Sequence, residues 1–102
     1  MSDPLLEKIK AYLQTEFKPS KIILIVSRAK GHASTKSDYD LLVVTSINFG
    51  SKWQAFDKAR TELFENLKIQ ADVWVYSEKD FEDWSNEFGS IPETAINTGI
   101  EL

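Results

Sequence analysis

The sequence contains no cysteine, and His32 is the single histidine among its 102 residues. Without cysteine, the chain has neither a disulfide framework nor a thiolate metal site. No apolar run reaches the roughly 18 residues that a membrane span requires, and the first residues form no apolar signal core. We therefore expect a cytoplasmic protein without a membrane segment, and we interpret the single histidine as a solvated loop residue.

Clusters of basic residues are absent as well. The net charge is −4, and the densest basic group is the pair Arg28 and Lys30. Domains that bind nucleic acid usually carry a broad positive patch that faces the phosphates, so nucleic acid is not an expected partner. A length of 102 residues with 42% hydrophobic residues fits one domain over residues 1–102 with a modest core.

Hydrophobic periodicity predicts helices that alternate with short strands. Strands are expected over residues 21–26, 38–45 and 70–76, where apolar β-branched residues are frequent. Helices are expected to begin at Pro4, at a turn after Ser27, after the capping box Ser51–Gln54, after Ser77 and at Pro92. This order predicts an α/β (α+β) fold in which helices flank a small mixed sheet, and the sequence leaves the individual strand directions open.

The helix after Ser51 carries an apolar stripe, which we expect to face the sheet. The stripe consists of Trp53, Phe56, Ala59, Leu63, Phe64 and Leu67. Further aromatic residues follow on the next strand and helix, at Trp74, Tyr76, Trp84 and Phe88. We interpret these four as core residues, with a partner surface as the alternative.

Two carboxylates stand at the entrance of the second strand, in the segment Asp38-Tyr39-Asp40. Residues i and i+2 of a strand point to the same face, and their Cα atoms lie ~6.5–7 Å apart. Carboxylates at this spacing can converge on Mg²⁺, which prefers oxygen ligands and substrate phosphates. Tyr39 points to the opposite face and is interpreted as a packing residue. For the motif alone, the alternative is a pair of solvated acids.

A third carboxylate, Asp72, interrupts the apolar third strand and shares a face with Trp74 and Tyr76. A carboxylate near a core strand is costly unless it is paired or bound to a metal. We therefore include Asp72 in the candidate site. The alternative is an acid at the end of the strand that reaches solvent.

The loop between the first two strands offers groups that suit phosphate. Backbone N–H groups at the start of a helix bind phosphate, and the Ser27 hydroxyl adds a donor. Arg28 and Lys30 bring positive charge to the same loop. The alternative for this segment alone is an ordinary turn between a strand and a helix.

Together, these segments resemble the minimal nucleotidyltransferase domain of the DNA polymerase β-like superfamily. The family pattern is a strand, then G-S-R-A-R-G, then a loop that ends in S-D-x-D, and then an apolar strand. The stretch KIILIVSRAKGHASTKSDYDLLVV follows this pattern, with Lys30 in place of the second arginine. The third acid of the family stands on a following strand, as Asp72 does. The ending at Gly99-Ile100 is also similar, so the resemblance extends over essentially the whole chain.

The resemblance implies a site and a reaction. The implied catalytic residues and ligands of Mg²⁺, with Mn²⁺ as the alternative metal, are Asp38, Asp40 and Asp72. The implied nucleotide-binding residues are Ser27, Arg28 and Lys30. The implied reaction transfers a nucleoside monophosphate, expected to be AMP from ATP, to a hydroxyl group with release of pyrophosphate.

The resemblance also implies a partner, because domains of this antitoxin type are often paired with a helical HEPN-type toxin. A hydroxyl on such a partner is the expected acceptor, and a homo-oligomer is left open.

Val26 departs from the family, which has glycine at this place. A β-branched residue disfavours positive φ and reduces the clearance for phosphate. The alternatives are therefore a module of this fold that binds nucleotide or protein without catalysis, and an oligomerisation scaffold.

Overall fold

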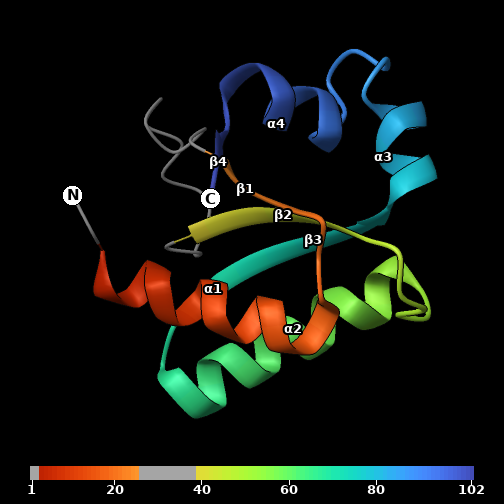
Figure 1. Ribbon diagram of the computed structural model, residues 1–102. Coiled ribbons are helices and arrows are strands. Elements are labelled where there is room, and N and C mark those ends of the chain that lie inside the picture. The colour runs from red at the N-terminus through yellow and green to blue at the C-terminus, as the bar shows by residue number, and fades with distance from the viewer. Residues whose placement is uncertain (1–2, 26–38) are drawn as a thin grey trace.

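The computed structural model describes residues 3–25 and 39–102, which form two layers of helices around one sheet (Figure 1). The helices are α1 (Pro4–Phe17), α2 (Lys52–Leu67), α3 (Glu78–Trp84) and α4 (Ile91–Thr98). The strands are β1 (Lys21–Ile25), β2 (Tyr39–Thr45), β3 (Ala71–Ser77) and β4 (Ile100–Glu101). Within the same residues, no helix combines the length and the apolar character required to cross a membrane.

The sheet has the strand order β3-β2-β1-β4 and mixed directions. β2 pairs with β3 in parallel, whereas β1 pairs with both β2 and β4 in antiparallel fashion. Parallel neighbours need a long crossover connection, and α2 provides it between β2 and β3. The predicted α/β fold with a small mixed sheet between helices is confirmed.

The two faces of the sheet are covered by different helices. α1 and α2 pack on one face, which we call the α1/α2 face, and α3 and α4 lie on the other side (Figure 1). The α1/α2 face holds the larger core, with thirteen buried residues that include Leu13, Leu41 and Leu63. The second face has six buried residues, among them Leu42, Tyr76 and Ala95.

Local sequence explains where the helices begin. Asp3 caps α1 by accepting hydrogen bonds from the N–H groups of Leu5 and Leu6. Ser51 and Gln54 form the predicted capping box of α2. These side chains satisfy the free N–H groups of the first helical turn.

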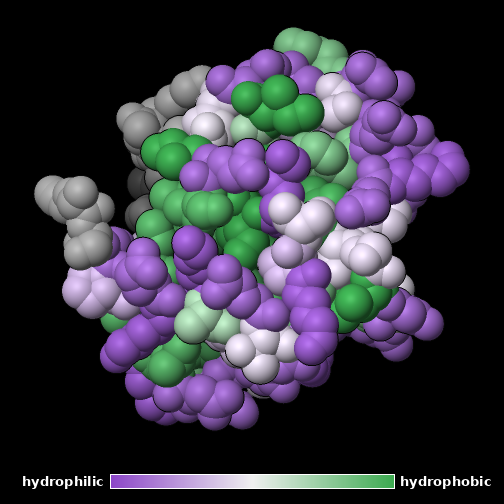
Figure 2. Space-filling view, in the orientation of Figure 1, coloured by the Kyte–Doolittle hydropathy of each residue, from purple (hydrophilic) through white to green (hydrophobic). Residues whose placement is uncertain are grey.

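Figure 2 shows that polar residues dominate the outer surfaces of the helices, while hydrophobic residues gather in the band between the two helical layers.

Some expectations about the helix α2 and the aromatic residues are wrong. Trp53 and Phe64 belong to the predicted apolar stripe, but they are 67% and 46% exposed. The physical reason is that α2 packs mainly on β3, which is the last strand of the sheet. The part of α2 that extends beyond this edge has no strand to cover it. Likewise, Trp84 is 47% exposed and Phe88 lies after α3 and is 97% exposed, so neither is a core residue.

The end of the described chain contains a short strand and a closely packed glycine that the sequence analysis does not predict. β4 was not predicted, because a strand of two residues carries no periodic pattern. Gly99 caps the C-terminus of α4 with an extended backbone (φ −85°, ψ 167°). A Cβ atom at this position would collide with the side chain of Ile23 and the carbonyl oxygen of Ala95. Glycine is therefore needed here because α4 ends in close contact with β1.

Candidate active site

Asp40 and Asp72 lie side by side at one end of the sheet. They are register partners on the parallel strands β2 and β3, so their Cα atoms are ~4.8 Å apart, the usual spacing of neighbouring strands. Both stand at the second position of their strands. Two carboxylates that are separated by 32 positions in the sequence thus become neighbours, because the crossover through α2 aligns the two strands.

Strand alternation places both carboxylates on the face that α3 and α4 cover. Asp40 alternates with Leu42 and Val44, and Asp72 alternates with Trp74 and Tyr76. We call this side of the sheet the acid face. Both acids are half-buried, and the sheet neighbour of Asp40 on its other side is Ile25, the last residue of β1. The acids therefore lie where β1 leaves the sheet and β2 enters it.

The residue between the two predicted acids of β2 faces the other way. The hydroxyl of Tyr39 donates a hydrogen bond of 2.8 Å to Oδ2 of Asp3, and its ring packs against the core of the α1/α2 face. This bond lowers the pKa of Asp3. The packing role predicted for Tyr39 is confirmed, and the contact holds the start of β2 to the start of α1.

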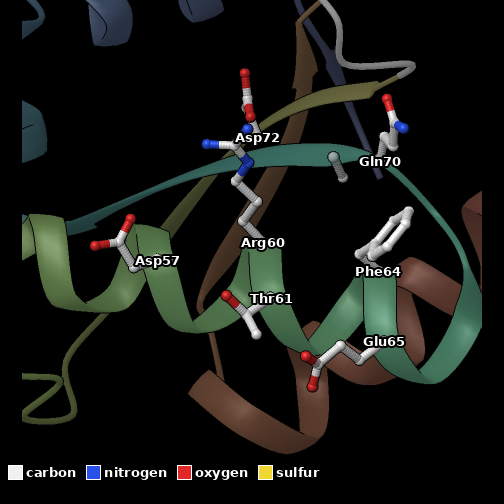
Figure 3. A pocket seen from close by; sticks show the side chains of 8 residues that line it. Asp57, Arg60, Thr61, Phe64, Glu65, Gln70 and Asp72 are labelled. Carbon is white, nitrogen blue, oxygen red and sulfur yellow. The ribbon is translucent and has the colours of Figure 1, made fainter.

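A polar pocket of about 480 Å³ opens beside Asp72, between α2 and the outer edge of β3 (Figure 3). It is lined by Asp57, Arg60, Thr61, Phe64, Glu65, Gln70, Ala71 and Asp72. Arg60 extends from α2 across β3 towards Asp72 (Figure 3). Within the described chain, Arg60 and Asp72 take part in no hydrogen bond or ion pair. The pocket is thus lined by a guanidinium group and a carboxylate group that form no ion pair within the described chain.

Sequence reasoning missed Arg60 as a residue of this site. It is one of two arginines in the chain, but it lies in the middle of α2 and belongs to no recognisable motif. Only the packing of α2 along the edge strand brings it to Asp72. The sequence offered no clue to this, because the strand order that makes β3 an edge strand is known only from the structure.

The remaining predicted site residues, together with the departure at Val26, lie outside the described residues. They are Ser27, Arg28, Lys30 and Asp38. Residues 3–25 and 39–102 contain no group of three acidic, histidine or cysteine side chains that could hold a metal ion. They do contain two of the three predicted ligands, Asp40 and Asp72, as adjacent oxygen donors. This donor chemistry fits Mg²⁺, which uses one or two carboxylates together with substrate phosphates.

Comparison with protein families agrees with this arrangement. The model of the family described as polymerase beta, nucleotidyltransferase matches residues 7–102. The chain belongs to this family. The match covers the described carboxylates and both layers of helices, and it supports a nucleotidyltransferase-type function at the level of the family. No curated protein and no solved structure matches the sequence.

Proposed function

We propose that this member of the polymerase β family transfers a nucleoside monophosphate, AMP from ATP, to a hydroxyl group on a partner protein. The observation that carries the proposal is the register alignment of Asp40 with Asp72 at the end of the sheet where β1 leaves and β2 enters. Two adjacent carboxylates on a half-buried face suit a reaction in which a bound cation neutralises phosphate charge and a carboxylate accepts a proton.

In the proposed reaction, Asp72 accepts the proton of the acceptor hydroxyl. The acceptor oxygen then forms a bond to the α-phosphorus of the nucleotide, and the bond from that phosphorus to the bridging oxygen breaks. Pyrophosphate leaves with the electron pair. Asp40, together with Asp38, would hold Mg²⁺ or Mn²⁺, which would neutralise phosphate charge when bound. Ser27, Arg28 and Lys30 would bind the terminal phosphates.

The choice of a protein acceptor rests on family resemblance and on charge. Antitoxins of this type act beside a helical HEPN-type toxin, and the net charge of −4 disfavours a nucleic acid acceptor. The test is co-expression with the neighbouring reading frame, followed by incubation with labelled ATP and intact-mass analysis. We expect the partner to gain one or more nucleoside monophosphates, and the Asp40→Asn/Asp72→Asn variant to leave its mass unchanged. No gain with any of the four NTPs would overturn the proposal.

A second candidate function is a non-catalytic module that binds nucleotide or protein. The observation that favours it is Val26, which stands where the family pattern has glycine. The Val26→Gly variant separates the two functions. If the wild-type chain is inactive and the variant transfers nucleotide to the partner, the natural protein is the binding module. Equal NTP affinity and equal turnover in both proteins would show that Val26 does not impair catalysis, and the argument for a non-catalytic module would fail.

A further inference from the structure

Within the described chain, the candidate site adjoins a pocket at the edge of the sheet. Asp40 is flanked by Ile25 and Asp72, and α3 and α4 cover the acid face farther along the strands. Beyond Asp72 the sheet ends, and the pocket between α2 and β3 begins. Asp72 belongs both to the carboxylate pair and to the pocket lining. A molecule in the pocket is therefore a neighbour of Asp72, whose carboxylate is proposed to accept a proton.

The free edge of β3 beside this pocket suits a polypeptide. No described strand pairs with the outer side of β3, so its backbone N–H and C=O groups there have no strand partner. Farther along, the ring of Trp74 meets Phe56 of α2 at 4.6 Å between centroids. Because Trp74 belongs to the acid face and α2 to the opposite face, this contact covers the edge at that point. The uncovered part of the edge is the part next to Asp72.

The side chains of the pocket indicate the chemistry of its occupant. The half-exposed ring of Phe64 offers an apolar surface, and Thr61 and Gln70 offer donors and acceptors. Asp57 and Glu65 form no ion pair within the described chain. With Asp72, they give three carboxylates against one guanidinium. This balance favours a basic segment, whereas Arg60 itself has only donors and needs an acceptor such as a backbone carbonyl.

We propose that this pocket is the acceptor site, and that it takes a hydroxyl-bearing residue within a basic polypeptide segment. Arg60 acts as a positioning residue: it holds a backbone carbonyl of the segment while the hydroxyl lies against Asp72. The assignment of the segment as acceptor rests on the proposed function. Its binding in the pocket does not, and the two are tested separately.

Binding is tested with short peptides that carry a central Ser, Thr or Tyr between lysines, and with matched peptides in which glutamates replace the lysines. We expect the lysine peptides to shift the backbone amide signals of Thr61, Gln70 and Asp72 in NMR spectra of the labelled protein. The Asp57→Asn/Glu65→Gln variant should weaken this binding at least about fivefold, a coupling of ~1 kcal/mol. If no lysine peptide shifts these signals, or if the glutamate peptides shift them equally, the inference is wrong.

The acceptor role is tested by blocking the pocket. Because the chain has no cysteine, Thr61→Cys can be capped with a bulky maleimide at one place. The matched control is Gln14→Cys on the exposed side of α1. We expect capped Thr61→Cys to lose transfer to the partner at least about tenfold while its ATP affinity stays within about twofold, and the capped control to match the wild type.

The kinetic constants of Arg60 variants distinguish a positioning role from a purely structural role. Arg60→Ala should raise the KM for the partner more than it lowers kcat, and Arg60→Lys should restore part of the loss. If capped Thr61→Cys or Arg60→Ala transfers as well as the wild type, the pocket is not the acceptor site. If the peptides bind in the pocket but the wild type transfers nothing, the proposed function fails while the docking site stands.

Discussion

The two faces of the sheet differ in what they bury. On the α1/α2 face, the strands present mainly apolar residues to a continuous core, as at Leu41, Val43 and Val73, and the buried Thr45 hydroxyl donates a hydrogen bond to the carbonyl oxygen of Phe17. On the acid face, the same strands begin with carboxylates and turn apolar only after Asp40 and Asp72. Carboxylates on a half-buried strand face reduce the apolar area that this face can bury. The comparison predicts that the α1/α2 face contributes most of the stability and that the acid face carries the proposed site.

The sharpest way to test this division is to remove a charge from the acid face. We expect Asp72→Asn to lower transfer by about 10²–10⁴-fold, the usual range for a lost general base. Its stability should change by less than about 0.5 kcal/mol, because the carboxylate has no bond to lose in the described chain. Urea unfolding and labelled-ATP transfer measure the two effects. A large loss of stability would show that Asp72 is a structural residue.

On the α1/α2 face, we expect a substitution to lower stability. Two adjacent residues of α2, one buried and one exposed, allow this to be tested. Leu63 is fully buried, so Leu63→Ala should lower the free energy of unfolding by about 2–5 kcal/mol. Phe64 is 46% exposed and lines the pocket beside Asp72. Phe64→Ala should therefore cost less than about 1 kcal/mol and should weaken peptide binding instead. Similar unfolding curves for both variants would contradict the division.

The smaller core of the acid face depends on the close contact between Gly99, at the end of α4, and β1. Gly99→Ala should lower stability by about 1–3 kcal/mol, because the added methyl group forces α4 away from β1. Gly89→Asn is the matched control, since Gly89 has free space around it and a positive φ that asparagine tolerates. Thermal unfolding of both variants measures the difference. Equal midpoints would mean that α4 adjusts freely on the sheet.

The smallest expected effect concerns a link between the two helices of the α1/α2 face. Burial, and then the hydrogen bond to Glu62, raise the pKa of the Tyr12 hydroxyl above its ordinary value. A raised pKa in the folded state means that the stabilisation is complete below the unfolded pKa of about 10 and is lost as the pH rises above it. Tyr12→Phe should therefore lose about 1 kcal/mol at neutral pH and should show a flatter decline of stability in alkaline solution. Parallel declines for both proteins would refute this assignment.

The sequence predicted the helices, the three longer strands and the fold class, because capping residues and periodicity are local signals. It could not show that Asp40 and Asp72 are register partners. That alignment depends on the parallel pairing of β2 and β3, which brings together residues far apart in the chain. The exposure of Trp53 and Phe64 was missed for a related reason. Periodicity identifies an apolar stripe on a helix, but it does not reveal where the sheet beneath that helix ends.

The pairing of the two carboxylates has a consequence for insertions and deletions. Asp40 and Asp72 meet only because α2 has the length that returns the chain to the start of β3. One residue added within α2 would rotate everything after it by ~100°. Leu63 would then turn away from the core, and a slip of β3 by one residue would point Asp72 to the opposite face. Length variation should therefore be tolerated in the segment 46–50 before the helix, whereas a single inserted residue inside α2 should abolish the site without altering any of its residues.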